Sequence, residues 1–209
     1  MIPLLQDFET IVLANGSFPT HSVPLSALRK AKRIVCCDDA AANLLNYGLE
    51  PSFIAGDMDS LSPELKERFA PIIFPDPDQE TNDLTKAMQF CEKNGWFEIT
   101  ILGATGKRED HSIANLSLLA DYGRDFRVQL LTDYGVFVPQ YTSEEYESYA
   151  GQQVSLFSLS ASSKVTTHNL RYPIHDRSLL SWWEGTLNEA VSDSFEIMID
   201  EGRLLIFRE

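Results

Sequence analysis

The chain has 209 residues, 44% of them hydrophobic, which is enough for one large domain or two small ones with packed cores. Its 31 acidic residues outnumber its 17 basic residues and give a formal net charge of -14. This balance argues against a nucleic-acid surface, and no apolar run approaches the length that spans a membrane. We therefore expect a globular protein that binds neither nucleic acid nor membrane.

Two local features indicate a cytoplasmic location. The first residues contain Asp7 and Glu9 and lack a basic leader, which argues against a secretory signal. Cys36 and Cys37 are neighbours in an expected strand, and Cys91 lies on the apolar side of an expected helix. Such positions favour reduced, buried thiols, as found in cytoplasmic proteins.

Short apolar runs alternate with amphipathic stretches up to about residue 133, which is typical of a mainly parallel sheet with flanking helices. A helix is expected over residues 82–93, where Leu84, Met88 and Cys91 recur at core-facing spacing. We assign residues 1–133 to an α/β domain. Its expected strands are residues 11–14, 34–37, 52–55, 72–74, 98–102 and 127–132.

After Asp133 the pattern changes to aromatic and β-branched runs separated by turn residues. A hairpin signal at residues 200–203 separates the last two runs. We expect residues 134–209 to form a small antiparallel β-sandwich domain. Its expected strands are residues 136–138, 153–159, 164–167, 194–199 and 204–207.

Asp57 and Asp59 leave the carboxyl end of one expected strand with i, i+2 spacing, so both side chains can point the same way. Two such carboxylates suit Mg²⁺, although an isolated Asp-x-Asp is more often an Asx turn. Further acids follow two other strands, namely Asp38-Asp39 and the stretch 78–83. Because the carboxyl ends of parallel strands meet at one sheet edge, we expect these acids to converge on one crevice.

The stretch 78–83 runs into the expected helix, with Thr81 or Asn82 as its N-cap. Asp83 then lies in the first helical turn. An acid there either stabilises the helix dipole or ligates a metal that bridges to phosphate, and the residues alone leave both interpretations open.

A glycine-bearing loop, residues 103–111, follows another strand and opens a helix, and Asn15-Gly16 forms a small turn at the same edge. Such a loop offers backbone N–H groups and the positive end of a helix dipole to an anion. Lys107 and Arg108 add charge where a polyphosphate would lie, although the glycine spacing is not that of a Walker loop. His111 is either a capped or half-buried imidazole, which is the commoner case, or a catalytic base.

In this order the motifs resemble those of the thiamin pyrophosphokinases over most of the chain. The resemblance implies that residues 1–133 bind nucleotide and metal, that residues 134–209 complete a thiamin pocket, and that two subunits pair as a homodimer with sites at their interface. The stretches that carry it are residues 14–16, 42–43, 56–60, 78–83, 106–111 with Asn115, and 185–189.

The resemblance also implies a role for individual residues. The implied ligands of Mg²⁺ are Asp39, Asp57, Asp59 and Asp83. The implied ATP and phosphate contacts are Asn15, Asp39, Asn43, Gln79, Lys107, Arg108, His111 and Asn115. The implied catalytic residues are Asp57, Asp59, Asp83, Arg108 and Asp110, and the implied thiamin contacts are Thr186, Leu187 and Asn188. Trp182 or Trp183 could stack on a ring of the substrate, but packing in the β-domain core is favoured.

The sequence departs from the family pattern in three places. Ala40 and Ala41 replace paired glycines, Lys107 replaces a glycine, and Leu187 replaces a serine that helps hold thiamin. The last change bears on the substrate more than on the reaction. We predict that Thr186 or Asn188 supplies the polar contact to the aminopyrimidine, while Leu187 packs on an apolar face.

The implied reaction is attack of the thiamin hydroxyl on the β-phosphorus of ATP, giving thiamin diphosphate and AMP. Catalysis would rest on positioning and charge neutralisation, with Asp110 or Asp83 accepting the hydroxyl proton. The alternatives are a pyrophosphokinase for another hydroxymethyl heterocycle such as a pterin, a Mg²⁺-dependent phosphohydrolase, and a non-catalytic binding module. The number of clustered carboxylates argues against the last of these.

Overall fold

The structure, a computed structural model, describes residues 9–209, so Asp7 lies outside the described residues. These residues form two compact units. The α/β unit comprises residues 9–118 and 124–133, and the β unit comprises residues 119–123 and 134–209.

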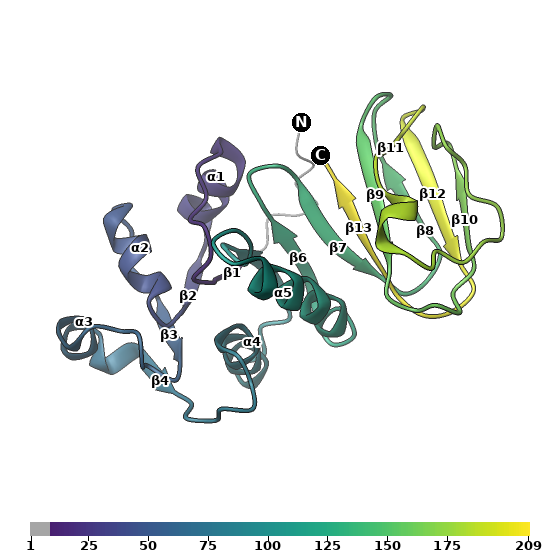
Figure 1. The fold of residues 1–209 in the computed structure, drawn as a ribbon. Helices are drawn as coiled ribbons and strands as arrows, with labels where there is room; N and C mark the ends of the chain where they lie inside the picture. Colours follow the sequence, from purple (N-terminus) through teal and green to yellow (C-terminus); the bar gives the residue numbers. More distant parts are fainter. Residues whose placement is uncertain (1–8) are drawn as a thin grey trace. The chain divides into compact units, whose positions relative to one another are not determined.

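A six-stranded parallel sheet is the centre of the α/β unit, with strand order β4-β3-β2-β1-β5-β6 (Figure 1). The strands are β1 (Thr10–Leu13), β2 (Arg33–Cys37), β3 (Phe53–Gly56), β4 (Ile73–Pro75), β5 (Glu98–Leu102) and β6 (Arg127–Leu131). Strands β1, β2, β5 and β6 are buried at nearly every position, because helices cover both faces of a parallel sheet. All six lie where the sequence predicts strands, and the α/β fold class is confirmed.

The helices connect these strands and follow local capping signals. They are α1 (Ser22–Lys30), α2 (Ala40–Asn46), α3 (Pro63–Arg68), the 3-10 turn η1 (Ala70–Ile72), α4 (Asp83–Lys93) and α5 (Glu109–Tyr122). Asn82 is the N-cap of α4, because its side-chain oxygen accepts the Thr85 N–H at 2.9 Å. The α4 helix packs on β2 and β3, which fixes its N-terminus beside their carboxyl ends. Among residues 9–209, none of the helices is long and apolar enough to cross a membrane.

Strand order reverses between β1 and β5, because β2 to β4 are added on one side of β1 and β5 and β6 on the other. A crevice opens at the carboxyl edge of such a switch point. Here the loops after β1 and β5 are bonded to each other: the Gly16 N–H donates to the Gly103 carbonyl at 2.6 Å, and the Ser17 N–H donates to the Thr105 carbonyl at 2.8 Å.

The β unit consists of two antiparallel sheets. This confirms the expected antiparallel β fold of the second part of the chain. Their strand orders are β11-β9-β13-β7 and β10-β12-β8. Gln140 ties the sheets together, because its side chain donates to the Ile197 carbonyl and accepts from the Tyr146 hydroxyl. The elements are β7 (Val136–Gln140), β8 (Glu144–Glu147), β9 (Gln153–Ser158), β10 (Val165–His168), η2 (Trp182–Gly185), β11 (Asn188–Glu189), β12 (Ser194–Ile199) and β13 (Leu204–Arg208).

The close approach of the two loops gives a stability prediction. A Cβ on Gly16 would lie 2.4 Å from the Gly103 oxygen and 2.5 Å from the Thr105 oxygen, both of them backbone atoms. Gly16→Ala should therefore cost about 3 kcal/mol, because the loops must separate to admit the methyl group. Urea unfolding monitored by circular dichroism measures this cost.

Gly48→Ala is the matched control. Gly48 has φ +91° and open space around its Cβ position, so its substitution costs only the strain of a left-handed alanine, about 1 kcal/mol. Equal costs for the two variants would contradict the steric explanation for Gly16.

Candidate active site

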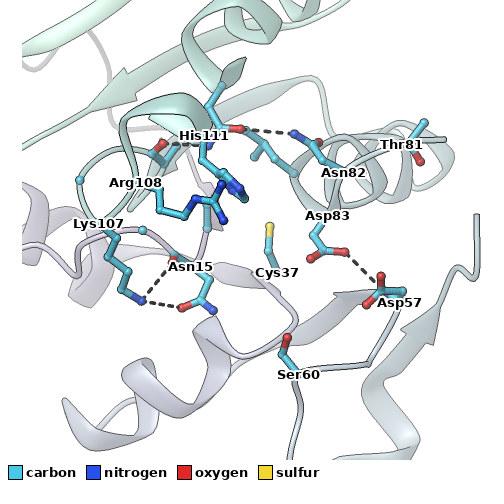
Figure 2. A pocket seen from close by; sticks show the side chains of 16 residues that line it. Asn15, Cys37, Asp57, Ser60, Thr81, Asn82, Asp83, Lys107, Arg108 and His111 are labelled. Atoms are coloured by element: carbon cyan, nitrogen blue, oxygen red, sulfur yellow. Dashed lines mark hydrogen bonds between the residues drawn. The ribbon is translucent and has the colours of Figure 1, made fainter. Parts of the chain in front are cut away.

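A crevice of about 450 Å³ lies at the carboxyl edge of the sheet in the α/β unit (Figure 2). Figure 2 shows Asp57 and Asp83 on one side of it and Lys107 and Arg108 on the other, with the Cys37 thiol between them. The crevice is lined by Ala14, Asn15, Gly16, Cys37, Asp57, Ser60, Thr81, Asn82, Asp83, Leu84, Ala104, Gly106, Lys107, Arg108, His111 and Asn115.

Three carboxylates converge at the ends of β2 and β3. Asp38, Asp57 and Asp59 each offer an oxygen within 4.8 Å of the others. The parallel register pairs Cys37 with Ala55, so residues that follow these two strands emerge side by side. Carboxylate oxygens at this spacing form a ligand set that suits a hard divalent cation.

Backbone hydrogen bonds stabilise this cluster. The Ser60 N–H donates to Asp38 Oδ2 at 3.0 Å, and the Asp59 N–H donates to Asp57 Oδ1 at 3.1 Å. The second of these bonds is an Asx turn, so the structural alternative considered for Asp-x-Asp is also present. Because Asp38 completes the cluster from another strand, the Asx turn is compatible with a metal site.

The carboxyl groups differ in their affinity for protons. Burial raises the pKa of Asp38 to about 6, and repulsion from Asp83, Asp59 and Asp57 acts in the same direction. The hydrogen bond from the Ser60 N–H opposes this rise. Burial and the charge of Asp57 also raise the pKa of Asp83. The Asp59 N–H is the main cause that lowers the pKa of Asp57.

Asp38 is only 2% exposed, and its Oδ1 has no hydrogen-bond partner among residues 9–209. A buried carboxylate oxygen without a donor is costly unless a cation compensates it. This unpartnered oxygen, together with the two neighbouring carboxylates, shows that the residues present fit a divalent cation.

The predicted ligands divide into two groups. Asp57, Asp59 and Asp83 are brought together: the Asp57 N–H donates to Asp83 Oδ1 at 3.3 Å. The third member of the convergent cluster is Asp38, whereas the sequence indicated its neighbour Asp39. Asp38 has φ 41°, and this left-handed turn precedes Asp39, which takes the N-cap position of α2 without a side-chain cap bond.

A buried lysine, which the sequence did not single out, lies beside the acids. Lys86 is 3% exposed, and its Nζ lies 3.7 Å from Asp57 Oδ2 and 3.7 Å from Asp83 Oδ1. The available signal was its i, i+3 spacing from Asp83 at the start of a helix. This signal is weak, because the buried residues of α4 around Lys86 are mostly apolar and indicate a core-facing side.

The opposite wall of the crevice is cationic. Lys107 has φ 58°, and its Nζ donates to the backbone oxygen and to Oδ1 of Asn15, each at 3.1 Å. Asn15 Oδ1 also accepts from Asn43 Nδ2 at 3.2 Å. Lys107 thus keeps a backbone conformation typical of glycine while its side chain joins the loops after β1 and β5.

Arg108 forms a bidentate pair with Asp110, at 3.0 Å from Nε to Oδ1 and 2.5 Å from Nη2 to Oδ2. The hydrogen bond from Arg108 lowers the pKa of Asp110 to about 2. Both side chains are exposed, and Arg108 lines the crevice.

Three further residues are predicted ATP contacts: Asn115 and His111 line the crevice, whereas Gln79 lies beside Asp57. Asn115 lines the crevice, and its Nδ2 donates to the Ala104 carbonyl at 2.8 Å. His111 also lines it but is exposed, so the expectation of a half-buried imidazole is wrong. Gln79 donates to the Pro77 carbonyl and helps lower the pKa of Asp57 through a hydrogen bond.

The predicted thiamin contacts lie in the β unit. The Thr186 hydroxyl donates to the Trp183 carbonyl at 2.8 Å. Asn188 is buried, and its amide is occupied by the backbone N–H and carbonyl of Tyr172, at 3.0 and 2.7 Å. Leu187 has φ 56° and is 78% exposed. Trp183 is 75% exposed, so the expectation that it packs in the core is wrong.

Family models match both parts of the chain. Residues 25–131 match the model described as thiamin pyrophosphokinase, catalytic domain, and residues 135–207 match thiamin pyrophosphokinase, substrate-binding domain. The first range contains the acids Asp57 and Asp83 and the cations Lys107 and Arg108.

Similar proteins carry the same name. Thiamine pyrophosphokinase 1 of Oryza sativa subsp. japonica is 34% identical in an alignment 200 residues long, and the match covers 81% of this chain and 75% of that protein. Thiamine pyrophosphokinase 1 of Arabidopsis thaliana is 32% identical in an alignment 106 residues long, and the match covers 46% of this chain and 39% of that protein.

Solved structures share the fold. A thiamine pyrophosphokinase from Bacillus subtilis matches with a TM-score of 0.77 and 21% identity, covering 96% of this chain and 98% of that one. A thiamin pyrophosphokinase from Candida albicans matches with a TM-score of 0.75 and 17% identity, covering 100% and 95% of the two chains. The resemblance in motif order is thereby confirmed, and the chain belongs to the thiamin pyrophosphokinase family, an enzyme family of diphosphotransferases that use ATP.

Proposed function

We propose that this chain transfers the diphosphate of ATP to the hydroxyl of thiamin, giving thiamin diphosphate and AMP, at the crevice of the α/β unit. The observation that carries this proposal is the pair of facing walls. Asp57 and Asp83 face Lys107 and Arg108 across the crevice, and Asp57 also belongs to the convergent set with Asp38 and Asp59. A polyphosphate needs cations along its oxygens and a metal seat beside them, and this arrangement offers both.

Asp38, Asp57 and Asp59 are the proposed Mg²⁺ ligands, because their oxygens converge and Asp38 Oδ1 finds no donor among residues 9–209. The bound ion would neutralise phosphate charge as the bond to the leaving nucleotide breaks. Asp83 lies next to these ligands. The role of Asp39 as a ligand stays a prediction from the family resemblance, and Asp39→Asn tests it.

Arg108 and Lys107 are the proposed phosphate contacts, with the N–H groups of the loop before α5. Asp110 holds the guanidinium of Arg108 in place, so the cation is oriented before substrate arrives. Asn15, Asn43, Gln79, His111 and Asn115 are proposed to hold ATP, as the resemblance implies.

Asp83 is the proposed acceptor of the hydroxyl proton, in preference to Asp110. Burial and the charge of Asp57 raise the pKa of Asp83, which makes it the stronger base. Arg108 lowers the pKa of Asp110 to about 2, which makes that carboxylate a weak base.

Residues 134–209 are proposed to complete the thiamin site, and residues 1–133 to bind nucleotide and metal. Thr186 Oγ1 donates to Trp183 and keeps lone pairs that can accept from the aminopyrimidine. Asn188 holds the Tyr172 segment in place, so it shapes the loop and leaves Thr186 as the polar contact.

The family resemblance also implies a homodimer, which we propose for this chain. Apolar side chains around η2 support it, because Leu180, Trp183 and Leu187 are 73%, 75% and 78% exposed. A surface of this kind is typical of a subunit interface. We also propose a cytoplasmic location, because all three cysteines are buried and free, as in a reducing compartment.

The reaction is tested by its products. Thiamin, ATP and Mg²⁺ with this protein should yield AMP and thiamin diphosphate in equal amounts, measured by ion-pair chromatography. Formation of ADP would indicate transfer of a single phosphoryl group, and phosphate release that ignores thiamin would indicate a hydrolase. Diphosphate transfer to a hydroxymethylpterin in preference to thiamin would indicate a different heterocycle.

Asp38→Asn and Asp39→Asn distinguish the two neighbouring acids. Asp38→Asn should lower turnover about 100-fold or more, roughly 3 kcal/mol of transition-state stabilisation, and weaken Mn²⁺ binding. Asp39→Asn should keep turnover within about tenfold of the unchanged chain. The reverse order would contradict the ligand set.

Metal-free stability gives a second readout for Asp38. The folded chain holds the Asp38 proton up to about pH 6, whereas the unfolded chain releases it near pH 4, so stability should rise as pH falls from 7 to 5. Asp38→Asn should melt at a higher temperature than the unchanged chain at pH 7. This advantage should shrink as the pH falls below 6 and vanish near pH 4, where the unfolded chain also holds the proton. A lower melting temperature for Asp38→Asn at pH 7 would contradict this account.

Trp183→Glu tests the dimer. A carboxylate in a buried apolar interface is unfavourable, so the variant should have half the mass of the unchanged protein in light scattering. Met198→Glu, an exposed change on β12, is the control and should leave the mass unchanged. An unchanged protein with the mass of one chain at all concentrations would refute the dimer.

A further inference from the structure

Lys86 has an unusual position for a lysine. It lies in the first turns of α4, where the helix dipole disfavours a cation, and its side chain is 2% exposed. A buried ammonium persists only when anions compensate for lost hydration. The anions here are Asp57 and Asp83, each 3.7 Å from Lys86 Nζ.

The oxygens of the acid cluster are divided between two cation positions. Asp57 Oδ1 accepts the Asp59 N–H, whereas Asp57 Oδ2 faces Lys86. Asp83 Oδ1 faces the same ammonium. The convergent set of Asp38, Asp57 and Asp59 is one position, and the Asp57–Asp83 pair, which already contains the ammonium, is the other.

We propose that Lys86 is a resident counter-cation that occupies the second cation position, so that the nucleotide-free chain takes a single divalent ion. This inference rests on the proposed metal seat. Lys86 is a positioning residue: it acts on the ion through Asp57 and Asp83, and it lets four carboxylates lie together before any metal binds. An ion pair that does not involve the metal ligands would leave the affinity for the metal unchanged.

Titration of the full chain with Mn²⁺ in the absence of nucleotide tests the proposal. The unchanged chain should bind one Mn²⁺. Lys86→Met removes a positive charge next to Asp57, so Mn²⁺ should bind about tenfold more tightly. Its metal-free melting temperature should fall, and saturating Mn²⁺ should restore most of the loss because the ion replaces the missing charge.

Lys93→Met is the matched control, because it removes the same charge from an exposed position on the same helix. Its Mn²⁺ affinity should stay within about twofold of the unchanged chain. Asp83→Asn combined with Lys86→Met removes one anion with the cation, and this double variant should return to an affinity within about threefold of the unchanged chain.

Each result decides the inference. An unchanged chain that binds two Mn²⁺, or a Lys86→Met variant with the affinity of the Lys93→Met control, overturns it while leaving the metal seat intact. An unchanged chain that binds no Mn²⁺ refutes the metal seat itself. If Lys86→Met does not fold, the double variant decides: folding with a single Mn²⁺ of normal affinity supports the inference, and failure to fold overturns it.

Discussion

Crowding of negative charge at one sheet edge is the constraint on which the site depends. Carboxylates that follow β2 and β3 and open α4 share a small volume in a chain of net charge -14. Their repulsion is offset by backbone donors such as the Ser60 N–H and by the ammonium of Lys86. Close approach also requires Gly56, because a Cβ there would lie 3.1 Å from Asp83 Oδ1 and 3.3 Å from Asp38 Cβ. The fold thus stores electrostatic free energy that a bound cation can release.

The opposite wall shows how the same edge keeps its cations apart from its acids. Lys107 is held by Asn15, and Arg108 is held by Asp110, so neither cation collapses onto the acids across the crevice. The loops that carry Asn15 and Lys107 follow β1 and β5, the two strands on either side of the switch in strand order. The cations and the acids are therefore kept apart because they follow different strands of the sheet. In the proposed function, a polyphosphate between the walls would have its oxygens toward both the cations and the proposed Mg²⁺ ligands, and this would give the substrate one orientation.

The sequence predicted the strands of the α/β unit well, because strands buried on both faces appear as apolar runs between helical patterns. It missed β8, whose residues include three glutamates and bury only Tyr146, and it missed the two-residue β11. In the site, it located the acidic strand ends but could not tell Asp38 from Asp39, because the choice depends on a left-handed φ at Asp38. Lys86 escaped because helical periodicity identifies apolar faces and says nothing about an ammonium buried among carboxylates.

In the β unit, the loop that contains Leu187 is energetically unfavourable in its conformation and in its exposure of apolar surface, and contacts within the described residues do not offset this. Leu187 adopts φ 56°, a conformation that costs a branched side chain roughly 1 kcal/mol, and it leaves 78% of its surface in water. The loop is nevertheless held in this state: the Leu187 N–H donates to Ser155 Oγ, and Asn188 is fixed by Tyr172. A strained, exposed leucine next to an exposed Trp183 is therefore a maintained feature and not an accident of a loose loop. Burial of such side chains against a second subunit or a substrate ring would recover part of the cost, and this relates the departure at Leu187 to binding rather than to folding.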